Sequence, residues 1–395
     1  MTIDDSLLRD LLDFTDEKGV LSFYVGHTPA QAADPQPTAP IEIRNQLKDL
    51  RATLTKRDAG VAKAVERRLD AINGELAHLL DPKAHGQGRA LFVGVDEGRT
   101  AAVSLQIPFR ERVVYHDGPF VRPLVSALDE GRAAGILVVS RSATRLLRWA
   151  VGEVEELDTD EFKVGDAQLA DIKSGPSHGT PSNPSQGLVN KERFEDRIDE
   201  NRNRFLRSMA EDVLARSKEH GWDRIILSGD VKLREFVADL LSHGDNGLRI
   251  VHADADWEHD TPAAIAQHAW PLLRSVHTER EQDLVDLAVE RALGGGAATV
   301  GLRHVCDALN EGRVAHLLFD DRLEISGYRS SEGTLHPEVS GPVAQADGVR
   351  FDREPLLIER MIEKATSTGA AVTPVGHAAS AFLGEHDGVA ALLRW

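Results

Sequence analysis

The residues best suited to chemistry in this sequence are the basic side chains of one stretch, residues 190–220. An arginine carries a planar guanidinium group that pairs with phosphate oxygens and also stacks on nucleobases. The basic residues of the stretch include Lys191, Arg193, Arg197, Arg202, Arg204 and Arg207. Acidic residues alternate with them, so the stretch is also consistent with a solvated helix face held by ion pairs four residues apart. The pattern therefore leaves two interpretations open, phosphate contacts or an ion-paired surface.

A polar loop is expected directly before these basic residues, at 173–187. Glycine, proline, serine and asparagine dominate the loop, and they favour turns over helices and strands. A structureless loop of this length inside a compact domain is either functional or disordered. A mobile surface loop is the simpler alternative.

The elements that must hold this loop are predicted from hydrophobic patterns on both sides of it. Strands are expected at residues 135–141 and 145–151 before the loop, and at 224–228 after the helix. The helix itself, residues 190–220, has apolar residues at helical intervals on one face. These residues are Phe194, Ile198, Phe205, Met209 and Val213. We therefore expect a mixed sheet covered by helices, with the loop projecting from it.

Other residues with chemical potential are better explained by structure. His252 and the acidic residues that follow it, up to Asp260, offer ligands for a metal, but aspartate is also a favoured helix cap, and no spacing here defines a coordination geometry. The glycines at 294–296 lack the Lys-Ser or Lys-Thr of a phosphate-binding loop. Cys306 reads as a packed thiol, and His316 as a strand residue. We expect neither a metal nor a cofactor.

Composition and charge restrict the possible partners. The chain has 395 residues, a net charge of −18 and a pI near 5.3. Such a charge opposes non-specific adhesion to nucleic acid, so we expect no DNA partner, and any RNA contact must be local or be organised by a protein partner. There is no run of eighteen apolar residues, the first five residues are acidic rather than signal-like, and there is a single cysteine. We therefore expect a cytoplasmic protein without a membrane segment.

Three α/β domains are expected from the order of the predicted elements. They are an N-terminal domain at 1–122, a middle domain at 123–270 with the loop 173–187 and the long helix 190–220, and a C-terminal domain at 271–395. In the third domain, Thr278 and Glu281 have the spacing of a capping box and predict the start of a helix there. The glycines at 294–296 predict its end.

Two stretches of the third domain resemble a known family. GLRHVCDALNEGRVAHLL at 301–318 and EHDGVAALLRW at 385–395 look like the C-terminal domain of archaeo-eukaryotic class I release factors and pelota. Residues 118–149 are similar to that family's junction into its middle domain. Within the family, the sequence most resembles the bacterial branch, which includes actinobacterial stress proteins and the hibernation factor Balon.

The resemblance implies a fold and a place of action. The fold would comprise a ribonuclease-H-like middle domain with a long projecting loop, and a C-terminal α/β/α domain. The place would be the ribosomal A site, which a body of this kind enters as a tRNA does. In release factors the middle-domain loop carries Gly-Gly-Gln, whose backbone positions water at the ester of peptidyl-tRNA. This sequence has Pro184-Ser185-Gln186-Gly187 instead, without the preceding glycines that allow positive φ.

The resemblance thus favours a ribosome-binding hibernation factor that is not an enzyme. Its expected partners are rRNA near the A site and the peptidyl-transferase centre, and elongation factor Tu. The residues expected to contact RNA are Lys173, Ser185, Gln186, Gly187, Lys191, Arg193, Arg197, Arg202 and Arg204. The alternative is a peptidyl-tRNA hydrolase acting in release or rescue, with Gln186 orienting the water. A third hypothesis is an RNA-binding adaptor that acts away from the ribosome.

Overall fold

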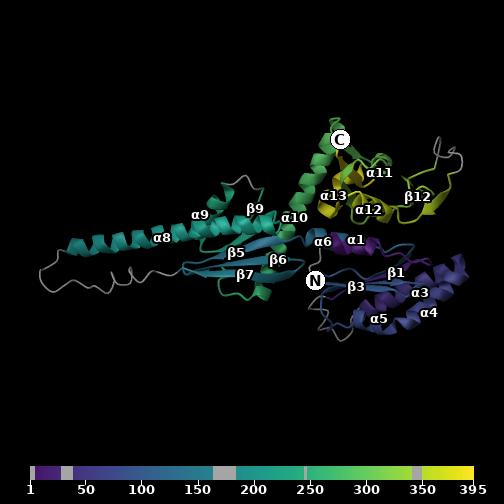
Figure 1. Cartoon of the computed structure of the whole chain (residues 1–395), viewed down its shortest axis with the longest axis horizontal. Coiled ribbons are helices and arrows are strands. Elements are labelled where there is room, and N and C mark those ends of the chain that lie inside the picture. Colours follow the sequence, from purple (N-terminus) through teal and green to yellow (C-terminus); the bar gives the residue numbers. More distant parts are fainter. Residues whose placement is uncertain (1–4, 28–38, 163–183, 244–246, 340–348) are drawn as a thin grey trace. The chain divides into compact units, whose positions relative to one another are not determined.

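The computed structural model describes residues 5–27, 39–162, 184–243, 247–339 and 349–395. The chain forms two compact units (Figure 1). Unit 1 combines Met1–Gly131 with Arg274–Trp395, and unit 2 is Arg132–Leu273. The division of the chain into three domains stays a prediction. None of the helices in the described residues is long and apolar enough to cross a membrane.

Unit 2 contains a five-stranded mixed sheet. Its strands are β5 (Ala134–Val139), β6 (Ala143–Ala150), β7 (Glu153–Glu161), β8 (Arg224–Gly229) and β9 (Arg249–His252). The strand order is β7-β6-β5-β8-β9. Strand β6 pairs antiparallel with both β5 and β7, whereas β8 pairs in parallel with both β5 and β9. Every residue of β5 and β8 is buried, as expected for central strands covered on both faces.

Helices cover both faces of this sheet. One face packs against α8 (Pro184–Glu219) and α9 (Val231–Ser242). The other face packs against the first part of α10 (Pro262–Leu293), where Trp149 and Trp270 stack with ring centroids 5.7 Å apart. At the end of β8, Gly229 has a φ of +111°, and a Cβ atom there would lie 2.0 Å from the carbonyl oxygen of Val139. Only glycine allows β5 and β8 to approach so closely at this point.

The N-terminal lobe of unit 1 is an antiparallel sheet with helices on one face. The sheet order is β3-β2-β1-β4. The strands are β1 (Val20–Gly26), β2 (Gly88–Gly94), β3 (Thr100–Leu105) and β4 (Arg112–His116). The helices are α1 (Asp5–Leu12), α3 (Ala39–Arg57), α4 (Ala59–Ala71) and α5 (Asn73–Leu80), of which the last three pack against β1 and β2. Helices α4 and α5 are separated at Ile72, whose buried side chain joins the core.

The C-terminal lobe of unit 1 has a second sheet, of order β10-β16-β11-β15, and a small third sheet. The strands of the second sheet are β10 (Ala298–Val300), β11 (Val314–Asp320), β15 (Ala371–Val375) and β16 (Val389–Leu393). The third sheet holds β12 (Gly327–Ser330), β13 (Leu335–His336) and β14 (Phe351–Glu354). The helices of this lobe are α11 (Leu302–Asn310), α12 (Leu357–Ser367) and α13 (His377–Gly384), and α6 (Arg122–Glu130) also belongs to unit 1. Cys306 is buried in α11 as expected, and burial raises the pKa of its thiol to about 12.

The predicted helix start at Thr278 is wrong. Helix α10 is continuous from Pro262 to Leu293, and the Thr278 hydroxyl donates to the carbonyl of Arg274 inside it, at 3.1 Å. Pro271 also lies within the helix, although proline removes one backbone donor. Buried Leu273 before Thr278 and buried Val285 after it show that packing continues across the predicted boundary and overrides the local signals.

Candidate RNA-contacting helix

The feature that the sequence singled out, the basic helix, is α8 in the structure. It spans 36 residues, Pro184–Glu219, and is therefore about 54 Å long at 1.5 Å per residue. The predicted loop boundary is wrong here, because residues 184–187 belong to the helix, which begins six residues earlier than expected. Proline suits the first turn of a helix, where its missing N–H has no partner to lose. The rest of the expected loop, with Lys173, lies outside the described residues.

Where the structure describes its side chains, the fully buried apolar residues of α8 lie in the C-terminal half. Met209 and Val213, two of the residues predicted to form the apolar face, are buried against the sheet of unit 2, together with Leu206 and Ala210. Ile198 and Phe205 are half-buried. Figure 1 shows the N-terminal part of α8 extending past the ends of β5, β6 and β7. The helix is therefore anchored at one end by apolar packing and projects at the other.

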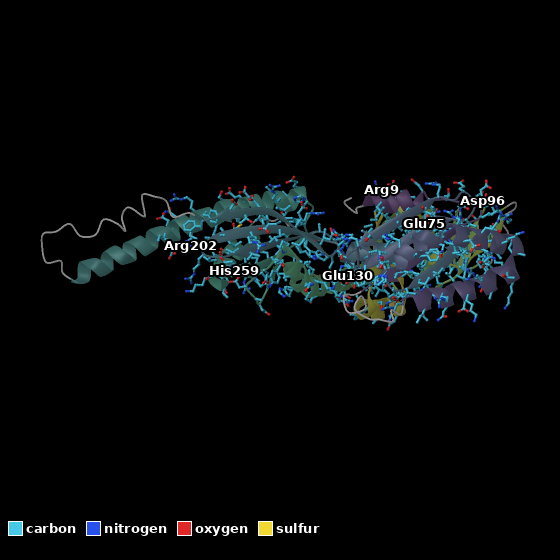
Figure 2. The ribbon with its side chains drawn as sticks, turned by 90° about the horizontal axis from the view of Figure 1, so that it is seen from below. Arg9, Glu75, Asp96, Glu130, Arg202 and His259 are labelled. Carbon is cyan, nitrogen blue, oxygen red and sulfur yellow. The ribbon has the colours of Figure 1, made fainter. Side chains whose placement is uncertain are left out.

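Arg202 is held inside unit 2 rather than presented to solvent. Its guanidinium lies over the ring of Phe162, 5.6 Å from the centroid, and its Nη1 atom donates to Asp199 at 2.8 Å. The Phe162 ring in turn packs against Phe205, with centroids 5.8 Å apart. The Arg202 side chain is only 19% exposed, and Figure 2 labels it on this part of α8. Its contacts are those of a packing residue.

Arg204 has the opposite environment. Its side chain is 74% exposed, and its nearest acidic partner, Glu200, is 3.9 Å away and equally exposed. Such a pair contributes little to stability, so it leaves the guanidinium available to another partner. There is no acidic residue between Arg202 and Arg207, and Arg207, which is also exposed, lies over the ring of Phe236.

The remaining predicted contact residues lie in the first part of α8. They are Ser185, Gln186, Gly187, Lys191, Arg193 and Arg197. The structure describes their backbone as helical, whereas their side chains lie outside the described part of the structure. Their role in RNA contact stays a prediction.

The packed end of α8 borders an acidic surface. A pocket of about 310 Å³ lies between β6, β7 and this end of the helix, and Asp158, Asp160, Asp212 and Glu219 line it. On β7, hydrogen bonds from Arg145 and Thr159 lower the pKa of Glu156, which keeps that carboxylate ionised. These carboxylates disfavour the binding of an anion at this pocket.

In the stretch from His252 to Asp260, Asp256 and Asp260 make local contacts of the kind expected of caps and turns. The Asp256 carboxylate accepts a hydrogen bond from the backbone N–H of Glu258 at 2.9 Å. Asp260 lies 3.2 Å from the ring of His268, on the first part of α10. These are local contacts at a turn and at a helix start.

A polar cluster in unit 1 was missed by the sequence analysis. Buried His116 lies 2.8 Å from Glu354 through Nε2 and 2.8 Å from Asp117 through Nδ1, so three potential metal ligands come within 4.8 Å of one another. Arg360 already supplies a positive charge, since it pairs with Glu354 at 2.9 Å, with Glu363 at 2.6 Å and with Asp117. Burial raises the pKa of Glu354, but the hydrogen bond and charge of His116, the backbone N–H of Leu356 and the charge of Arg329 together outweigh it and hold the net pKa below its ordinary value. The arrangement is that of a structural ion-pair network.

Comparison with solved structures finds translation factors. One is an archaeal translation termination factor, aRF1, with 18% identity, 100% of this chain and 99% of that chain covered, and a TM-score of 0.24. A second is a ribosome-bound archaeal Pelota, with 16% identity, 78% and 77% covered, and a TM-score of 0.42. A third is Dom34 of S. cerevisiae, with 12% identity, 78% and 79% covered, and a TM-score of 0.38.

Comparison by sequence finds no match among curated proteins. A family model does match, at residues 119–272, a range that contains unit 2 up to its penultimate residue. The middle of this chain, with the sheet and the helix α8 described above, is thus similar to bacterial archaeo-eukaryotic release factor family 10.

Proposed function

We propose that this protein is a ribosome-binding translation factor of the release-factor and pelota type. It occupies the vacant A site and holds the ribosome idle without hydrolysing peptidyl-tRNA. One observation carries the proposal: residues 119–272 match a release-factor family, yet Pro184-Ser185-Gln186-Gly187 replaces the catalytic Gly-Gly-Gln. The strand order β7-β6-β5-β8-β9 supports it further, because this is the order of the ribonuclease-H-like domain that the resemblance implies.

The backbone around Gln186 supports the absence of hydrolysis. Residues 184–187 belong to α8, and a helical backbone has φ near −63°. A Gly-Gly-Gln loop depends on glycines that reach positive φ and bring the backbone close to the reacting ester. Pro184 also lacks a backbone N–H that could donate to water. Gln186 is therefore poorly placed to orient a nucleophilic water.

The charge distribution supports a local mode of binding. With a net charge of −18, the whole chain is repelled by RNA, and the acidic pocket at the packed end of α8 adds to this repulsion. The projecting part of α8 carries Lys191, Arg193 and Arg197, and exposed Arg204 follows them. These residues contact rRNA phosphates in the proposed complex, and elongation factor Tu is the partner that the resemblance suggests for delivery.

Sedimentation with vacant ribosomes tests the proposal. We expect the full-length protein to pellet with ribosomes at low salt and to dissociate as salt rises, because each phosphate contact releases counterions. The double variant Lys191→Glu/Arg193→Glu should abolish pelleting. The matched control Arg216→Glu/Lys218→Glu makes the same charge change at the packed end of α8 and should pellet like the wild type. Absence of the wild type from the pellet, or equal loss in both variants, would overturn the proposal.

A second experiment separates the proposal from the hydrolase alternative. Ribosomes loaded with peptidyl-tRNA are incubated with the wild-type protein and with Gln186→Ala, and peptide release is measured. We expect no release with either protein and equal pelleting of both. Release by the wild type that Gln186→Ala abolishes would establish the hydrolase instead. Binding to free RNA without binding to ribosomes would favour the adaptor hypothesis.

A further inference from the structure

A pocket of about 570 Å³ lies in the N-terminal lobe of unit 1, between α5 and the strands β2 and β3. Helix α5 contributes Glu75, which Figure 2 labels, together with His78 and Leu79. The sheet contributes two cross-strand pairs, Arg89 with Ser104 and Leu91 with Ala102. Cross-strand partners lie on the same face of a sheet, so these four side chains form one wall of the pocket.

The unusual residue of this pocket is Arg89. Its side chain is 3% exposed, and its Nη1 atom donates to the carbonyl oxygen of His78 at 2.9 Å. Within the described part of the chain, its Nε and Nη2 atoms are buried and have no hydrogen-bond partner. A buried guanidinium that lacks a paired anion is costly, because the lost hydration is not replaced. Burial accordingly lowers the pKa of Arg89, although the charge of Asp81 acts in the opposite direction.

The two unpartnered nitrogens lie on the same edge of the guanidinium plane. Nε and Nη2 together form the fork that binds two oxygens of one carboxylate or phosphate group. The bond from Nη1 to His78 fixes the orientation of the plane and leaves this edge unused. The chemistry of the unsatisfied atoms therefore specifies an oxyanion.

The rest of the pocket suits an apolar body attached to that anion. Leu79 and Leu91 line it, and the small side chain of Ala102, exposed on the edge strand β3, leaves it open to solvent. His78 and His85 are exposed at its rim. Because both nitrogens have almost no solvent-accessible surface, a ligand reaches them only when the groups around them move, and surface side chains change rotamer rapidly.

We propose that this pocket binds a small organic anion, a carboxylate or phosphate monoester with a compact apolar body, and that Arg89 pairs with its oxygens through Nε and Nη2. The site uses no residue of α8 and does not depend on ribosome binding. Nothing in the proposal requires a chemical reaction, so its consequence is a ligand-dependent stabilisation of the N-terminal lobe.

Calorimetric titration of the full-length protein tests the proposal. The probes are phenyl phosphate and benzoate as the two classes of aromatic anion, inorganic phosphate as an anion without an apolar body, and benzamide as a neutral counterpart of benzoate. We expect saturable binding of at least one aromatic anion. Whichever of phenyl phosphate and benzoate has the lower dissociation constant identifies the preferred oxyanion. Inorganic phosphate and benzamide should each bind at least about tenfold more weakly, because inorganic phosphate lacks the apolar body and benzamide lacks the negative charge.

Two variants locate the binding. Arg89→Gln removes the charged fork, and Ala102→Leu fills the pocket from an exposed position without touching the guanidinium. Each variant should lower the affinity for the aromatic anion by about tenfold or more. The control Arg67→Gln, at an exposed arginine of the same lobe, should leave this affinity unchanged. No saturable binding of either aromatic anion, benzamide binding as tightly as benzoate, or binding unchanged in both variants would overturn the proposal. Ala102→Leu keeps the test decisive if Arg89→Gln fails to fold.

Discussion

The two units of the molecule are stabilised in different ways. Unit 2 is one continuous stretch of chain whose central strands, β5 and β8, are entirely buried apolar runs between helices. Unit 1 is assembled from the two ends of the chain, and buried charged groups join its lobes. Arg122 lies 3.4 Å from Glu359, and Glu354 lies 2.8 Å from His116. Apolar packing defines unit 2, whereas long-range ion pairs determine how the halves of unit 1 meet.

The largest loss of stability that tests this difference is expected when Arg360 of unit 1 is replaced. Arg360→Met leaves the buried Glu354 carboxylate without its arginine, and loss of one partner in a buried network costs about 4 kcal/mol of unfolding free energy. Urea denaturation followed by far-ultraviolet circular dichroism measures it. Arg353→Met, at an exposed arginine on the adjacent strand β14, is the control and should change little. A loss below about 1 kcal/mol would show that the network does not hold unit 1 together.

A comparable effect of different origin is expected in the core of unit 2. Leu227 is fully buried in β8, and Leu227→Ala should cost about 3 kcal/mol through lost burial and the cavity left behind. Tryptophan fluorescence reports mainly on this unit, since Trp149, Trp222, Trp257 and Trp270 lie in it and the fifth tryptophan, Trp395 of unit 1, is already 70% exposed. Val231→Ala, at a side chain that is 56% exposed, should leave the transition within about 0.5 kcal/mol of the wild type. Equal effects of the two substitutions would contradict the apolar account of unit 2.

The unfolding free energy of unit 1 should depend on pH through its buried carboxyl group, Glu359. Burial raises the pKa of Glu359 from 4.5 to about 7 in the folded chain, although Arg122 lowers it in part. Between these values the unfolded chain releases the proton and the folded chain retains it, so stability falls as pH rises through this window. The fall attributable to Glu359 is at most about 3 kcal/mol, at 1.36 kcal/mol per pKa unit.

Glu359→Gln isolates this contribution, because other titrating groups affect both proteins alike. The unfolding free energy of the wild type minus that of the variant should decline between pH 4.5 and about 7 and stay constant above. A difference that stays flat between pH 4.5 and 7 and rises with pH only below 4.5 would show that the carboxylate is favoured by folding and that Arg122 outweighs burial.

The smallest effect concerns two neighbouring arginines of α8, Arg202 and Arg204. Arg202→Ala removes a guanidinium packed on Phe162 and should cost about 1 kcal/mol in unit 2, whereas Arg204→Ala should cost less than about 0.5 kcal/mol. In ribosome pelleting the order should reverse, with Arg204→Ala the weaker binder. Equal stability losses would mean that Arg204 is also part of the packed surface, and the projecting end of α8 would then begin before it.

Local patterns in the sequence were sufficient to predict most helices and strands of unit 2 and several elsewhere in the chain. The apolar runs of β5 and β8 and the positions of Met209 and Val213 on α8 follow from periodicity, because a buried face repeats at the period of its own element. Helix α11 likewise has local signals in the sequence, with apolar residues on one face and glycines on both sides. The mixed α/β character of the chain follows from the same patterns.

The tertiary structure decided what these patterns could not. The continuity of α10 through Pro271 and Thr278, the start of α8 at Pro184 and the presence of α13 depend on the surfaces against which each helix packs. Which charged residues are paired was also undetermined. Arg202 and Arg204 are two residues apart on one helix, yet only Arg202 meets an aromatic ring.

The same limit applies to Arg89 and Glu354. No local pattern in the sequence marks either residue as buried, and only the folded chain buries them, one with two unsatisfied donors and the other beside His116. His116 and Glu354 are 238 positions apart, and no local pattern encodes such a distance. Periodicity reports which face of an element is buried, whereas the partner of a buried charge is fixed only when distant segments come together, because the energy of that charge depends on the distance and orientation of groups far away in the sequence.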